Sequence, residues 1–75
     1  MKTLKDCQKN QKVRVLKLHA PKDLKQRFIS LGIMKEAIIE MIESAPGKST
    51  IVVKVGKMTL ALRGQEAELI EVKAL

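Results

Sequence analysis

Residues 20–37, APKDLKQRFISLGIMKEA, decide the fold, because this is the one segment whose apolar residues recur at helical spacing. Leu24, Phe28 and Leu31 follow one another at intervals of four and three positions, which places them on one face of a helix. Gly32 predicts the end of that helix, since the residue just past the last turn commonly adopts a left-handed conformation that glycine takes without steric cost. The chain that follows has strand-like patterns, so we expect this short helix to cover a small β-structure.

Residues 51–62 predict a β-hairpin. Apolar residues recur at every second position on both sides of Gly56-Lys57. A glycine at the first position of a two-residue loop suits a type II′ turn, which joins two antiparallel strands. In the register that this turn imposes, three apolar pairs face each other on one side of the sheet: Val55 with Met58, Val53 with Leu60, and Ile51 with Leu62.

Three further segments have strand patterns. In residues 12–19 the alternation slips by one step near Val15, which predicts a β-bulge, because the slip would otherwise reverse the faces of the strand. Residues 37–43 are apolar on both faces, and residues 69–72 form a last short strand. Five short strands in 75 residues predict a mainly β fold. We expect a small five-stranded barrel rather than an open sheet, with one short α-helix between the first and second strands.

The formal net charge of +7 is unevenly distributed along the chain. Residues 1–35 hold ten Lys or Arg and two Asp, a balance of +8, whereas residues 36–75 hold five Lys or Arg and six Glu, a balance of −1. A basic half of this kind suits a phosphate, an acidic lipid surface or an acidic protein patch. The chain has no Trp or Tyr and a single Phe, so it lacks the aromatic platform on which single-stranded nucleic acids stack.

The length and composition predict one small domain, residues 1–75, in the cytoplasm. No segment reaches the roughly 20 apolar residues of a membrane span, and the N-terminal residues lack the apolar run of a signal peptide. The single cysteine, Cys7, cannot form an internal disulfide and fits a reducing compartment. We expect it in the core as a small apolar residue.

The sequence contains no catalytic or metal-binding pattern. His19 is the only histidine, and its spacing to Cys7 and to the carboxylates is not that of a zinc site. Ser44 and Ser49 lie in a turn-rich stretch, where hydroxyls normally cap backbone groups. We therefore expect neither an enzyme nor a resident metal or cofactor.

Several short motifs are ordered and spaced as in FeoA-type proteins. Residues 27–33, RFISLGI, resemble the RL-x-x-LG-[ILM] helix end of that family. Residues 45–46, AP, resemble the AP that follows the next strand in the family. Residues 60–72, LALRGQEAELIEV, resemble its closing LALR…A…I-x-V pattern. The resemblance runs over nearly the whole chain.

The resemblance implies an SH3-like β-barrel that assists FeoB, a ferrous-iron transporter of the membrane with a cytosolic G domain. It also connects the chain to the homologous C-terminal domain of some metal-dependent repressors. One departure stands out. Where the family usually has Pro-Gly after the helix, this chain has Lys35-Glu36. Because Glu tolerates a positive φ poorly, we expect a wider or strained turn there.

The leading hypothesis is an interaction module that binds the cytosolic part of a FeoB-like transporter. The surface expected to do so contains two basic and two apolar residues: Arg27, Met34, Lys35 and Ile38. One alternative is a basic small barrel that binds nucleic acid, which the charge of residues 1–35 favours. Another is a metal-responsive module like the C-terminal domain of metal-dependent repressors. One chain has too few soft or imidazole ligands for that role, so it would need metal ligands shared across an oligomer.

Overall fold

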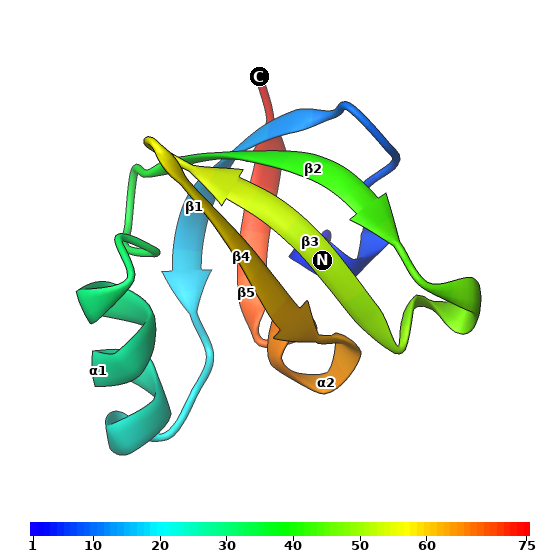
Figure 1. Cartoon of the computed structure of the whole chain (residues 1–75). Helices are drawn as coiled ribbons and strands as arrows, with labels where there is room; N and C mark the ends of the chain where they lie inside the picture. The colour runs from blue at the N-terminus through cyan, green and yellow to red at the C-terminus, as the bar shows by residue number, and fades with distance from the viewer.

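Five antiparallel strands form a single sheet, with one short helix packed at its side (Figure 1). The structure is a computed structural model that describes all 75 residues, from Met1 to Leu75. The strands are β1 (Lys12–Leu18), β2 (Ile38–Ser44), β3 (Thr50–Val55), β4 (Met58–Arg63) and β5 (Ile70–Ala74). The helices are α1 (Lys22–Ser30), α2 (Gly64–Ala67) and the single-turn 3₁₀ segments η1 (Leu4–Asp6) and η2 (Pro46–Lys48). The expected mainly β fold, with its helix between the first and second strands, is confirmed.

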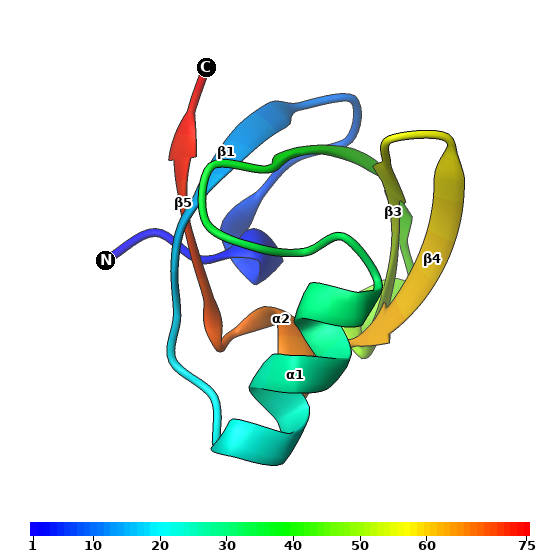
Figure 2. The ribbon, with the colours of Figure 1, turned by 90° about the vertical axis from the view of Figure 1, so that its left-hand side faces the viewer.

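The sheet has the strand order β4-β3-β2-β1-β5 and curls until its two halves face each other (Figure 2). A single cluster of 16 buried apolar residues fills the space between the halves. No ladder joins the two edge strands, β4 and β5, so strand pairing does not close the barrel. Instead, α2 connects these strands and packs against η1, β3 and β4.

The β3–β4 hairpin has the predicted register. Its loop residue Gly56 has a φ of 60°, as the first position of a type II′ turn requires. All three predicted apolar pairs are present: Val55 with Met58, Val53 with Leu60, and Ile51 with Leu62. Their burial is unequal, because β4 is an edge strand. The three β3 members are buried and Leu60 is half-buried, whereas Met58 remains 44% exposed.

Helix α1 ends as predicted, at a glycine with positive φ. Gly32 has a φ of 88°, and its N–H donates to the carbonyl oxygen of Ile29 at 3.0 Å. The N–H of Ile33 donates to the carbonyl oxygen of Phe28 at 2.8 Å, and the two bonds together form a Schellman motif. The motif turns the chain sharply and buries Ile33 in the core.

The helix contributes one large side chain to the core. Phe28 is 1% exposed, whereas Leu24 and Leu31, the other members of the predicted apolar stripe, are only half-buried. Figure 2 shows the reason: α1 lies at the open side of the barrel and is not enclosed by the sheet. Its apolar face therefore meets the core mainly through Phe28, with Leu24 packed against the edge of the core cluster.

Strand β1 contains the predicted bulge. Its register with β5 shifts between Val15 and Lys17. Leu16 and Leu18 are two positions apart and would lie on the same face of a regular strand. Because of the bulge, Leu16 turns away from the core and is half-buried, whereas Leu18 is buried. An apolar side chain is thereby placed on the surface beside α1.

The N-terminal residues 1–7 pack on the barrel, which the sequence patterns did not predict. Leu4 and Cys7 are buried, and burial raises the pKa of the Cys7 thiol. The segment also pairs with β5, since the N–H of Val72 donates to the carbonyl oxygen of Lys2 at 2.9 Å. The expected core position of Cys7 is confirmed.

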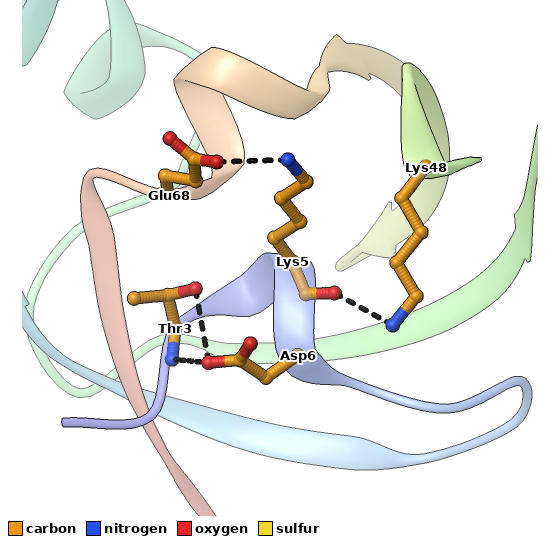
Figure 3. A network of polar contacts seen from close by, with 5 residues as sticks. All are labelled: Thr3, Lys5, Asp6, Lys48 and Glu68. Carbon is orange, nitrogen blue, oxygen red and sulfur yellow. Dashed lines mark hydrogen bonds and ion pairs between the residues drawn. The ribbon is translucent and has the colours of Figure 1, made fainter.

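A polar network ties this N-terminal segment to two other parts of the chain (Figure 3). The N–H of Thr3 donates to the Asp6 carboxylate at 2.8 Å, and this bond lowers the pKa of Asp6. The ammonium of Lys48, in η2, donates to the carbonyl oxygen of Lys5 at 2.7 Å. The Lys5 side chain forms an ion pair with Glu68, just after α2, at 2.8 Å. The network therefore fixes η1 against η2 and α2.

Candidate partner-binding groove

A groove lies between helix α1 and the second half of β1, and the loop from α1 to β2 closes one end of it. Figure 2 shows these three segments around the open side of the barrel. The groove has a volume of about 670 Å³. It is lined by Leu16, Lys17, Leu18, Lys25, Ile29, Met34 and Lys35. We call it the α1 groove.

The α1 groove exists because β2 pairs with only the first part of β1. The β1–β2 ladder covers Lys12 to Arg14. At Val15 the loop from α1 to β2 replaces β2 as the hydrogen-bonding partner of β1. The Val15 N–H donates to the Ala37 carbonyl oxygen at 2.9 Å, and the Glu36 N–H donates to the Val15 carbonyl oxygen at 2.8 Å. Beyond this point no strand lies beside β1 on that side, and α1 is its neighbour across the groove.

Glu36 adopts the strained conformation that the departure from the family pattern predicted. Its φ is 76°, in the left-handed region, which costs a non-glycine residue about 1–2 kcal/mol. The hydrogen bond from its N–H to Val15 holds it there. Its carboxylate accepts from the Arg14 guanidinium at 3.3 Å, and Glu36 lines a neighbouring groove instead of the α1 groove.

The α1 groove contains apolar side chains that are partly exposed to solvent. Ile29 on the helix and Met34 on the loop are each 42% exposed. Leu16, turned outward by the bulge, adds a half-buried side chain from the strand. Three separate segments thus bring apolar side chains together in one concave place, an arrangement typical of a binding surface.

The charged residues of the α1 groove are all lysines. Lys17, Lys25 and Lys35 are exposed, and none of them forms an ion pair. No carboxylate lines the groove. The charged groups that line the groove are therefore all positive, which suits a negatively charged partner.

The structure brings together two of the four residues predicted to bind a partner. Met34 and Lys35 both line the α1 groove. Ile38, 48% exposed, lies beyond the loop and lines the neighbouring groove. Arg27 lies in neither groove and donates to the Glu66 carboxylate, at the start of α2, at 3.2 Å.

Five residues of the groove were not among those predicted: Leu16, Lys17, Leu18, Lys25 and Ile29. The spacing of Lys25 and Ile29 by four positions does place them on one helical face. The sequence contains no signal that this face lies opposite Lys17, because that depends on where β2 separates from β1.

Outside the groove, the ionisable side chains form only pairs. His19 Nε2 lies 2.6 Å from Glu71 Oε1, and both side chains are partly exposed. No three His, Cys, Asp or Glu side chains are close enough to hold a metal ion together. The longest helix, α1, has nine residues, and no helix is long and apolar enough to cross a bilayer.

A curled five-stranded antiparallel sheet around one apolar core, with a single helix at its open side, defines a small SH3-like barrel. The FeoA domain family has a sequence model that matches residues 2–74, which is nearly the whole chain. The chain belongs to this family.

Known proteins similar to the chain carry the same family name. The chain is 34% identical to an Fe(2+) transport protein A from Campylobacter jejuni, over 97% of this chain and 99% of that protein. Its fold matches the FeoA protein of Chlorobium tepidum with a TM-score of 0.91, at 27% identity, over 99% of this chain and 70% of that one. It also matches zinc-complexed FeoA of Stenotrophomonas maltophilia, a prokaryotic SH3 domain protein, with a TM-score of 0.84, at 27% identity, over 97% and 91%.

These findings confirm the FeoA resemblance and the SH3-like fold. They associate the family with Fe(2+) transport, in agreement with the iron-uptake function that the resemblance implied.

Proposed function

We propose that this protein is an accessory protein of ferrous iron uptake, and that it acts by binding the cytosolic part of a FeoB-type transporter. The observation that carries the proposal is the α1 groove, where exposed Ile29 and Met34 lie among three lysines without acidic partners. Family membership supplies the connection to iron transport. The proposal places the protein in the cytoplasm, where such a partner surface is accessible.

The proposed mechanism is binding without catalysis. A module of this kind changes the transporter only through unequal affinity for two of its states, because a ligand that binds both states equally shifts nothing. The lysines accelerate the encounter with an acidic surface, and burial of the exposed apolar atoms slows dissociation. Since Ile29 and Met34 are 42% exposed, their complete burial contributes about 1 kcal/mol each, which suits a reversible association.

The first test is a titration of the purified protein against the transporter's cytosolic domain and against the whole transporter in detergent. We expect Lys35→Glu to weaken binding about tenfold, because it replaces an attractive rim charge with a repulsive one. Raising the salt concentration should slow association more than it accelerates dissociation. Lys35 is exposed and unpaired, so the variant should unfold at the same temperature as the wild type.

The matched control is Lys57→Glu, which makes the same change of charge at the exposed tip of the β3–β4 hairpin. It should bind nearly as well as the wild type. Absence of binding to both forms of the transporter would reject the proposal. Tight, salt-sensitive binding to RNA instead would favour the nucleic-acid alternative.

A further inference from the structure

We infer that the α1 groove takes an extended acidic segment whose apolar side chains alternate with carboxylates, and that this segment belongs to the transporter's cytosolic part. The identification of the transporter as its source rests on the proposed function. The chemistry of the segment rests on the groove itself: on its charge, on the free edge of β1 and on its concave shape.

The charge of the groove selects an acidic segment. Lys17, Lys25 and Lys35 come from the strand, the helix and the loop, so ammonium groups stand on every wall. No carboxylate lines the groove, and Glu36, which follows Lys35 in the chain, pairs with Arg14. A basic segment would meet only like charge here, and a neutral one would leave the ammonium groups without partners.

The free edge of β1 favours an extended segment over a helical one. On the groove side, β1 is paired as far as Val15 and has no strand beside it from Leu16 to Leu18. Such an edge offers backbone donors and acceptors to an added strand, with side chains pointing alternately to opposite faces. Each segment that lines the groove carries both a lysine and an apolar side chain, so a strand laid there meets both kinds of residue. Its apolar side chains contact Leu16, Ile29 and Met34, and its carboxylates pair with the lysines.

The shape of the site argues against a membrane surface as the occupant. A flat bilayer meets convex, projecting residues, whereas the apolar side chains here line a groove of about 670 Å³ between a helix and a strand. This volume lies within the range of about 300–1,000 Å³ that is usual for sites that enclose small ligands or short segments.

The probe for this inference is a synthetic octapeptide in which Glu and Leu alternate. Titrated into the isotopically labelled protein, it should shift the backbone amide signals of Leu16 to Leu18, Ile29 and Met34. Three matched probes serve as controls: an octapeptide of alternating Lys and Leu, one of alternating Glu and Ser, and vesicles that contain phosphatidylserine. We expect weaker binding of all three, since each lacks the charge, the apolar side chains or the extended shape.

Two double variants with equal changes of charge locate the binding site. Lys17→Glu with Lys25→Glu should weaken binding of the Glu-Leu octapeptide at least tenfold. Lys9→Glu with Lys57→Glu, at two exposed turns away from the groove, should weaken it much less. The inference would be overturned by equal losses of affinity in the two double variants or by preferred binding of the vesicles. It would also be overturned by signal shifts centred on Ile38 and Lys54, which line the neighbouring groove.

Binding to the whole transporter distinguishes a failure of this inference from a failure of the proposed function. If the wild type binds the transporter and the groove double variant binds it equally well, the inference is wrong and the proposed function stands. If the octapeptide binds in the groove but the transporter is not bound, the proposed function and the transporter as source of the segment are both wrong, whereas the preference of the groove for an acidic extended segment stands.

Discussion

Phe28→Ala is expected to lower the free energy of unfolding by about 3–5 kcal/mol. Phe28 is the only aromatic residue of the chain and is 1% exposed in the middle of the core cluster. Its removal deletes the main apolar contact between α1 and the sheet. A nine-residue helix is not stable alone in water, so α1 should lose its place together with this contact.

The loss is a large part of the total, since a chain of 75 residues has a stability of roughly 4–11 kcal/mol. Urea unfolding followed by circular dichroism measures it. Ile29→Ala, one position along the same helix, is the matched control and should cost under about 1 kcal/mol, because Ile29 is 42% exposed. A cost below about 1 kcal/mol for Phe28→Ala would show that α1 does not cover the core.

Gly64→Ala is expected to lower the stability by about 3 kcal/mol, although the change adds a single methyl group. A Cβ atom on Gly64 would lie 2.3 Å from the carbonyl oxygen of Lys48. This oxygen belongs to the backbone and cannot rotate away. The Gly64 N–H also donates to the Ser49 carbonyl oxygen at 2.9 Å, so any shift that relieves the clash stretches a buried contact.

Lys48, whose carbonyl group lies against Gly64, is also held through its side chain. Its ammonium donates to the Lys5 carbonyl oxygen, as Figure 3 shows, so η2 cannot retreat without disturbing the N-terminal segment. Gly47→Ala is the control for the added methyl group. A Cβ atom on Gly47 would lie in open space. The substitution therefore costs only the free energy of placing alanine in the left-handed conformation, at a φ of 72°, which is about 1 kcal/mol. If thermal unfolding shows Gly64→Ala to be no more destabilising than Gly47→Ala, the close approach of α2 and η2 is not present in solution.

Local patterns in the sequence predicted the elements that depend on neighbouring residues. The hairpin register follows from Gly56 and the alternation around it, and the end of α1 follows from Gly32. The bulge near Val15 and the strained turn at Glu36 also have local causes, a slip in alternation and a missing glycine. In each case one residue sets the geometry of the backbone within a few positions.

Contacts between distant segments were not predictable in this way. Cys7 was expected in the core from its residue type, but residues 1–7 show no strand or helix period, so their packing on the sheet was not predicted. The missing Cβ of Gly64 makes room for the carbonyl group of Lys48, which lies 16 positions earlier in the chain. The close approach is a property of packing and leaves no periodic signal in the sequence.

In the candidate site, too, some residues could be predicted from the local sequence, whereas others depend on contacts between distant segments. Met34 and Lys35 were predicted as part of the partner surface, and both line the α1 groove. Their neighbours Lys17 and Lys25 could not be assigned to the same surface, since β1 and α1 become the two walls only where β1 extends beyond its ladder with β2. Arg27 was predicted as a partner contact from its charge, and the structure pairs it with Glu66.

Photocrosslinking in cells that contain both the protein and a FeoB-type transporter tests the central claim most directly. A photoreactive phenylalanine analogue replaces Met34 in the α1 groove in one variant, and Lys57 at the tip of the hairpin in a second. Both positions are exposed, so neither replacement disturbs the core. We predict a covalent product with the cytosolic part of the transporter from position 34 and none from position 57. A product from position 57 alone, or no transporter product from either position, would contradict the assignment of the α1 groove as the transporter-binding site.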